Sequence, residues 1–190
     1  MGLDEAVFYA INGLAGRSPL LDQAALALSR AGTVLWPGAL AAAYWFWTRR
    51  REALIAGPAL VALIVVADFL GAQLKQAVAR GRPCRVLPDV RELAGCGATF
   101  GFPSNHAVNS AAAAAFLQVL YPATGWVSWP LVAMIGFARI YVGAHFLSDV
   151  LGGWLLGGLV GAGVALWLLR RPEFGRKVTS GTAASGPVNE

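Results

Sequence analysis

The stretch VLGGWLLGGLVGAGVALWLL, Val150–Leu169, contains no Asp, Glu, Lys or Arg. A helix needs about 20 mostly apolar residues to cross a bilayer core of ~30 Å, so this stretch predicts a transmembrane helix. Ala31–Thr48 and Ala53–Ala67 are also free of these charges, as is the whole of Leu93–Ala138. YPATG at Tyr121–Gly125 divides that last run into two spans, so the sequence predicts five.

The composition agrees with a membrane protein. The chain of 190 residues is 57% hydrophobic and 13% charged, where a soluble domain has roughly 25% charged residues. We expect one membrane domain over residues 1–170 and a basic, disordered cytoplasmic tail over residues 171–190. The predicted fold class is all-α, a polytopic membrane helix bundle of about five transmembrane helices.

The N-terminal segment MGLDEAVFYAINGLAG lacks the basic start of a signal peptide. Its apolar residues Val7, Ala10, Ile11 and Leu14 recur at helical spacing, which predicts a short amphipathic helix on the outer membrane face. RSPLL then opens the first span, with Ser18 as N-cap and Pro19 at the first helical position.

Basic residues near the span ends set the orientation. TRRRE at Thr48–Glu52 and RRPEFGRK at Arg170–Lys177 fall on the same side of a five-span chain, which should be cytoplasmic. The loop from Lys75 to Pro103 then faces outward despite being cationic, and this favours a functional use for its charge. Its two cysteines, Cys84 and Cys96, are a candidate disulfide if that compartment is oxidising, although two free thiols fit as well.

Three polar clusters map to the outer face: KQAVARGRP from Lys75, FPSNHAVNS around His106, and ARIYVGAHFLSDV around His145. Arg offers phosphate a planar fork of donors, and Lys offers a point charge. The segment PSNH leads into a helix, whose first backbone N–H groups can also face an anion. A phosphate pocket follows from these residue types.

The chain has only two histidines, and both lie in these clusters. His145 and Asp149 are four residues apart, so we expect both on one face of the fifth helix, with the carboxylate fixing the imidazole tautomer for nucleophilic attack. His106 is then available for acid-base catalysis. Asp68, two helical turns before Lys75, is expected either to brace Lys75 or Arg82 or to make a structural pair inside the membrane.

Together these residues resemble the type 2 phosphatidic acid phosphatase superfamily, which includes membrane lipid phosphatases. The pattern consists of K-x6-RP, PSxH and R-x5-H-x3-D, matched by Lys75, Arg82, Pro83, Pro103, Ser104, His106, Arg139, His145 and Asp149. The N-terminal FYAINGLAGRSPLLDQ also resembles bacterial undecaprenyl-diphosphatases of the bacitracin-resistance type.

The resemblance implies a role for each matched residue. His145 would be the nucleophile that forms a phosphohistidine, Asp149 would orient it, and His106 would protonate the leaving group and later activate water. Phosphate would be bound by Lys75, Arg82, Ser104, Asn105 and Arg139. No metal and no cofactor is implied. The family usually has Gly at the position of Asn105 and Ser at that of Ala138; the first difference puts activity in doubt if a close backbone approach is needed.

The sequence thus predicts a multi-pass enzyme of the bacterial cytoplasmic membrane whose active site faces the periplasm or cell exterior. It would hydrolyse a lipid phosphate, with undecaprenyl diphosphate favoured over phosphatidylglycerophosphate, phosphatidic acid and lipid A. A lipid phosphotransferase and a non-enzymatic lipid-phosphate-binding protein are the alternatives. The expected partners are this substrate and membrane lipids, with no nucleic acid; the oligomeric state is left open.

Overall fold

The computed structural model describes residues 2–97 and 100–171, and at residues 31–37 it describes the backbone without the side chains. The predicted tail beyond residue 171 lies outside the described residues. In chain order the helices are α1 (Leu3–Asn12), α2 (Pro19–Ser29), α3 (Ala31–Thr48), α4 (Arg50–Val78), α5 (Pro83–Val86), α6 (Asn105–Leu120), the 3-10 turn η1 (Pro122–Thr124), α7 (Gly125–Tyr141) and α8 (Leu147–Leu169). The described residues contain no strand, so the all-α prediction is confirmed.

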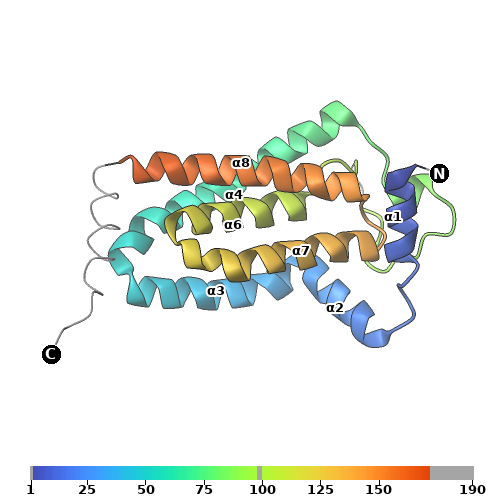
Figure 1. Ribbon diagram of the computed structural model, residues 1–190, viewed down its shortest axis with the longest axis horizontal. Coiled ribbons are helices and arrows are strands. Elements are labelled where there is room, and N and C mark those ends of the chain that lie inside the picture. The colour runs from blue at the N-terminus through green and yellow to red at the C-terminus, as the bar shows by residue number, and fades with distance from the viewer. Residues whose placement is uncertain (1, 98–99, 172–190) are drawn as a thin grey trace.

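The long helices form a bundle whose members run lengthwise, and α1 lies across one end (Figure 1). Within the described residues, two segments are long and apolar enough to cross a bilayer on those grounds alone: Arg50–Val86, which contains α4, and Leu147–Leu169. α6 and α7, with 16 and 17 residues, run beside them.

The first predicted span is not one continuous helix. It begins as expected, because Ser18 Oγ accepts the Leu21 N–H at 3.5 Å and Pro19 occupies the first helical position. The chain then leaves helical geometry at Arg30, where φ is −93° and ψ is 121°, and α3 starts at the next residue. Hydropathy alone could not reveal this break, since both sides of it are apolar.

Small residues allow α6 and α8 to pack with their backbones in contact. A Cβ added at Gly157 would lie 2.0 Å from the Val108 carbonyl oxygen, and one at Gly161 would lie 2.2 Å from that of Ala112. Spacing of four residues places these glycines on one face of α8. This close packing fixes the start of α6 against the start of α8, where the polar clusters lie.

The helix α1 is tied to one end of the bundle. Its Phe8 is fully buried, and the Asn12 amide donates to the carbonyl oxygens of Arg91 at 2.9 Å and Tyr141 at 2.8 Å. The Asn12 Oδ1 also accepts the Arg91 N–H at 2.9 Å. One buried amide therefore joins α1, the loop after α5 and the end of α7.

Candidate active site

Asp149 lies in the first turn of α8 and is fully buried. Its Oδ2 accepts the Phe146 N–H at 2.9 Å, which satisfies one of the free donors at the helix start and fixes the carboxylate. His145 precedes α8, so the prediction that both residues lie on one helix face is wrong. The capping contact brings them together instead, with His145 Nδ1 at 3.5 Å from Asp149 Oδ2.

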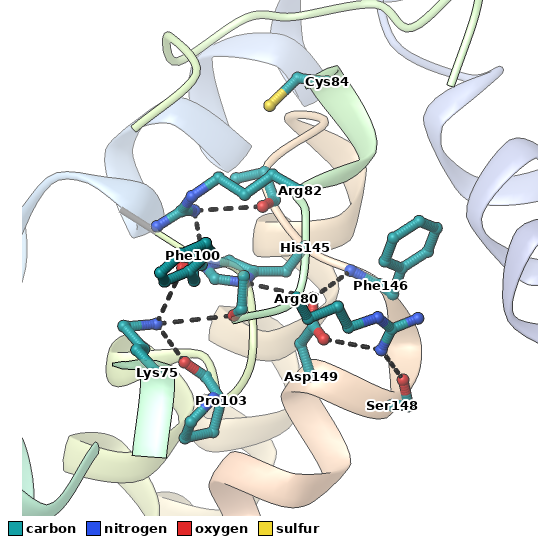
Figure 2. A network of polar contacts seen from close by, with 12 residues as sticks. Lys75, Arg80, Arg82, Cys84, Phe100, Pro103, His145, Phe146, Ser148 and Asp149 are labelled. Atoms are coloured by element: carbon teal, nitrogen blue, oxygen red, sulfur yellow. Dashed lines mark hydrogen bonds and ion pairs between the residues drawn. The ribbon is translucent and has the colours of Figure 1, made fainter. Parts of the chain in front are cut away.

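The other ring nitrogen of His145 faces a cation. Arg82 Nη1 lies 3.1 Å from His145 Nε2 and also donates to the Ala144 carbonyl at 3.2 Å. A guanidinium can only donate hydrogen bonds, so this contact requires a lone pair on Nε2. We infer that the neutral ring carries its proton on Nδ1, toward Asp149, and Figure 2 shows the chain of contacts from Arg82 through His145 to Asp149.

Burial also favours the neutral imidazole. His145 lies in the loop between α7 and α8, and burial lowers its pKa well below the ordinary value. Asp149 opposes this shift, while the charges of Arg139 and Arg82 add to it. The ring is therefore neutral at neutral pH, and its Nε2 has an electron pair available for chemistry.

Lys75, in the last turn of α4, is also buried. Its ammonium donates to the carbonyl oxygens of Phe100 at 3.4 Å, Gly101 at 3.5 Å and Pro103. These contacts hold the segment that leads into α6 (Figure 2). In this structure Lys75, which the sequence predicts to bind phosphate, therefore positions the PSNH segment.

Two further predicted phosphate ligands have buried donors without partners. Ser104, the N-cap of α6, is fully buried, and Arg139 near the end of α7 is 9% exposed. Ser104 Oγ and Arg139 Nε make no hydrogen bond to any described residue. A buried donor without a partner carries a free-energy cost of about 1–3 kcal/mol, which an anion would relieve.

The second histidine occupies the first turn of α6. His106 Nε2 lies 3.1 Å from the Ser29 carbonyl oxygen at the end of α2. A carbonyl only accepts, so His106 carries a proton on Nε2 in this contact. The C-terminal end of α2 therefore borders the site.

Asp68 makes a structural pair, which is one of the two outcomes expected for it, and its partners include Asn105. Asp68 accepts hydrogen bonds from Asn105 Nδ2 at 2.8 Å and Asn109 Nδ2 at 3.1 Å, and it makes no ion pair with Lys75 or Arg82. Asn105 has helical geometry, so its replacement of the usual Gly needs no positive φ. Its side chain turns toward α4, where Gly71 leaves room for it.

Sequence reasoning missed Arg80, which contacts the Asp149 carboxylate, and the two residues that hold Arg80, Ser148 and Asp4. Arg80 Nη1 donates to Asp149 Oδ1 at 2.8 Å and to Ser148 Oγ, and Arg80 Nη2 contacts Asp4 Oδ2 at 2.6 Å. The Arg80 guanidinium also lies over the Phe146 ring, 4.3 Å from its centroid. The only sequence signal was an additional cation inside the K-x6-RP motif.

The loop that carries Arg80 and Arg82 contains the cysteines. Cys84 and Cys96 form a disulfide in the structure. Their sulfur atoms lie near a Glu92 carboxylate oxygen, but oxidised sulfur is a poor metal ligand because metals bind the thiolate. Arg85 Nη2 donates to the Gly97 carbonyl at 2.9 Å and so joins the two ends of this closed loop.

An apolar groove of about 390 Å³ opens between α2 and α7. Side chains of both helices line it, including Leu21 and Leu28 from α2 and Met134 and Phe137 from α7. The groove follows α2 toward Ser29, whose carbonyl contacts His106. A hydrocarbon surface thus adjoins the polar site.

Comparison with known proteins places this geometry in a family. Residues 56–173 match the PAP2 superfamily. The lipid A 4'-phosphatase of Porphyromonas gingivalis is 29% identical over 84% of this chain and 70% of its own length. The undecaprenyl-diphosphatase of Sulfolobus acidocaldarius is 32% identical over 53% of this chain and 50% of its own length.

Solved structures agree with the sequence comparison. Aquifex aeolicus LpxE superposes with a TM-score of 0.69 at 27% identity, covering 86% of this chain and 95% of that protein. A transmembrane PAP2 type phosphatidylglycerolphosphate phosphatase from Bacillus subtilis has a TM-score of 0.63 at 23% identity, covering 98% of this chain and 87% of that protein, and this likeness concerns the fold. The chain belongs to the PAP2 superfamily and is a membrane lipid phosphatase. The predicted membrane bundle and family resemblance are thereby confirmed.

Proposed function

We propose that this chain hydrolyses a lipid (di)phosphate at the outer membrane face through a phosphohistidine on His145. One observation carries the proposal: the buried imidazole of His145 lies between the Arg82 guanidinium on Nε2 and the Asp149 carboxylate facing Nδ1. This arrangement leaves Nε2 unprotonated and directed at a cation that can bind phosphate oxygens.

The reaction proceeds in two steps. The Nε2 lone pair of His145 attacks phosphorus, and an N–P bond forms while the P–O bond to the lipid breaks. Protonated His106 gives its proton to the departing oxygen. Water then loses a proton to His106 and attacks the phosphohistidine, which releases inorganic phosphate and restores the imidazole.

Electrostatic stabilisation of the transferring phosphoryl group falls to the surrounding donors. Arg82 and Arg139 supply forked cationic donors, and Ser104 supplies a hydroxyl at the start of α6. The buried, unpartnered Ser104 Oγ and Arg139 Nε support this assignment. Lys75 contributes its charge while holding the Phe100–Pro103 segment. Asn105 contributes its backbone N–H, because its side chain is hydrogen-bonded to Asp68.

Two observations support an outward-facing site. The Cys84–Cys96 disulfide lies in the loop that carries Arg82, and disulfides persist in oxidising compartments outside the cytoplasm. The basic cluster Arg49–Arg51 lies at the junction of α3 and α4, at the opposite end of the bundle from α1 (Figure 1). Basic residues favour the cytoplasmic side.

The favoured substrate is undecaprenyl diphosphate. The N-terminal resemblance and the name of the Sulfolobus relative support it. A lipid A phosphate is the second candidate, because the Porphyromonas relative matches over more of the chain. The groove between α2 and α7 fits a hydrocarbon chain of either lipid.

Purified protein in detergent, assayed for phosphate release on a panel of lipid phosphates, tests the proposal. We expect kcat/KM to be highest for undecaprenyl diphosphate among this substrate, lipid A, phosphatidylglycerophosphate and phosphatidic acid. Transfer of phosphate to a second lipid in place of phosphate release would make the protein a phosphotransferase. Retained binding with no turnover on any of the four would make it a lipid-phosphate-binding protein.

A further inference from the structure

The buried Asp149 carboxylate has nitrogen-bearing side chains on two sides, and one of them, Arg80, is charged. His145 Nδ1 lies 3.5 Å from Oδ2, and Arg80 Nη1 lies 2.8 Å from Oδ1. Figure 2 shows the Arg80 and His145 contacts meeting at this one carboxylate. An ionised carboxylate without a cationic partner is costly to bury, so Arg80 compensates a charge that neutral His145 cannot.

Arg80 is itself held in place by residues from three parts of the chain. Asp4 of α1 accepts from its Nη2 at 2.6 Å, and Ser148 of α8 accepts from its Nη1. Its backbone carbonyl accepts the Gly101 N–H at 2.8 Å. Asp4 in turn accepts the Ser148 N–H at 3.0 Å and its hydroxyl at 2.5 Å, so α1 is fastened to the start of α8.

The local backbone directs Arg80 to this position. The helix α4 ends at Val78, and the left-handed geometry of the following C-cap residue Ala79, with φ at 50° and ψ at 34°, turns the chain sharply. The Arg80 side chain then packs on the Phe146 ring, 4.3 Å from its centroid. Arg82, two residues later, contacts His145. Two arginines of one motif thus serve the two ends of the His145–Asp149 pair.

We propose that Arg80 is a positioning residue, held by Asp4 of α1, that pairs with the Asp149 carboxylate and keeps it aligned with the imidazole of His145. This inference rests on the proposed function, because alignment matters only if His145 reacts. The helix α1 then does more than contact the membrane, because its Asp4 holds Arg80 and Arg80 holds the Asp149 carboxylate.

Kinetics of the full-length protein in detergent, with undecaprenyl diphosphate as probe, test this role. We expect Arg80→Gln to slow single-turnover phosphoenzyme formation tenfold or more with little change in KM, because no substrate contact is lost. Arg80→Lys keeps the charge and should retain a larger part of the rate. The matched control is Arg85→Gln, a cation in the same loop that contacts the Gly97 carbonyl and should stay within twofold of wild type.

The pH profile separates positioning from mere structural support. Charged groups around the His145–Asp149 pair come from α4 and the following loop, α1 and α7: Lys75, Arg80, Arg82, Asp4 and Arg139. Removing the nearby Arg80 charge makes the His145 imidazole easier to protonate, so the acidic limb of kcat/KM should move to higher pH. Arg80→Lys should leave the limb in place. Asp4→Asn should lower the rate through misplacement of Arg80, whereas Glu5→Gln, in the same turn of α1, should not.

The outcomes distinguish the inference from the proposed function. An active wild type whose Arg80→Gln and Asp4→Asn variants keep the wild-type rate and acidic limb overturns the positioning role alone. A wild type that neither releases phosphate nor forms a phosphoenzyme overturns the proposed function itself. If Arg80→Gln fails to fold in detergent, the decision passes to Arg80→Lys and Asp4→Asn, and unchanged rates in both reject the inference.

Discussion

In the proposed mechanism, His145 and its immediate contacts carry most of the chemistry. The ring is buried, one nitrogen faces Arg82 and the other faces Asp149. These contacts specify a neutral imidazole with its proton on Nδ1, although Nε2–H is the commoner form in solution. The tautomer is a property of this ring that can be measured apart from any activity.

Nitrogen NMR of histidine side chains can test this assignment. The chain has only two histidines, so ¹⁵N-histidine labelling in micelles should give two ring systems, with the His106→Ala variant providing the assignment. Because its pKa lies below the ordinary value, we expect His145 to remain neutral and Nδ1-protonated as the pH falls through ~6.5. A titration midpoint near 6.5, or a neutral ring protonated on Nε2, would contradict the assignment.

The rate lost when His106 is removed should depend on the leaving group, because a general acid contributes typically 10² to 10⁴ in rate. A lipid diphosphate expels a phosphate monoester and nitrophenyl phosphate expels a phenolate, so both need less protonation than phosphatidic acid. We expect His106→Ala to lose most activity on phosphatidic acid in single-turnover phosphoenzyme formation. Equal losses across the three substrates would remove His106 from this role.

At the scale of helices, the contact of α6 with α8 fixes the site. The start of α6 supplies Ser104 and His106, and the start of α8 supplies Asp149. A backbone hydrogen bond from Ser104 N to the Asp149 carbonyl at 3.0 Å joins them. The glycine face of α8 permits this proximity, so its loss should affect both stability and activity.

Two adjacent glycines provide a matched test of this packing. A Cβ at Gly157 would lie 2.0 Å from the Val108 carbonyl oxygen, whereas a Cβ at Gly158 would meet no atom within 4 Å. We expect Gly157→Ala to destabilise the protein by about 1–3 kcal/mol through overpacking. Gly158→Ala should be neutral or slightly stabilising because Ala favours helix. Thermal unfolding in detergent compares them, and equal midpoints would rule out the close packing.

At the scale of the molecule, the bundle has chemically different ends. One end carries α1, the disulfide loop and the candidate site, and the other carries the junction of α3 and α4 with Arg49–Arg51. This polarity predicts how the chain crosses the membrane. Nucleophile and phosphate ligands would then face the compartment in which the disulfide forms.

Cysteine labelling in intact cells tests this orientation. Leu3 and Arg50 are both exposed, so a cysteine at either is equally free of protein cover. We expect a membrane-impermeant thiol reagent to label Leu3→Cys and to spare Arg50→Cys until the cells are opened. The reverse pattern would invert the topology. Without reductant, native Cys84 and Cys96 should remain unlabelled because they are paired.

Local patterns predicted much of this arrangement. Absence of charge identified the apolar runs, and the cationic residues and two histidines identified the residues of the candidate site. Hydropathy could not show the break at Arg30, since helix geometry changes there without a change in polarity. His145 lies outside α8 because Phe146 is the N-cap and the helix begins at Leu147. Helix ends are the least certain part of a sequence-based prediction.

Long-range pairs were the other part that sequence could not supply. Arg80 meets Asp4 across 76 residues and Asp149 across 69, and a charged residue in a loop gives no indication of its partner. Asp68 shows the same limit: the sequence left open whether it braces a cation or makes a structural pair, and only the three-dimensional structure identifies its partners as the amides of Asn105 and Asn109.

The most direct test of the account is to trap and locate the phosphoenzyme. Purified protein is mixed with undecaprenyl diphosphate, quenched in alkaline detergent to preserve phosphohistidine, digested and mapped by mass spectrometry. We predict phosphate on His145, absent from His145→Ala, which should also show no turnover on any substrate. Turnover without a phosphorylated residue, phosphate on a different residue, or activity retained by His145→Ala would contradict the account.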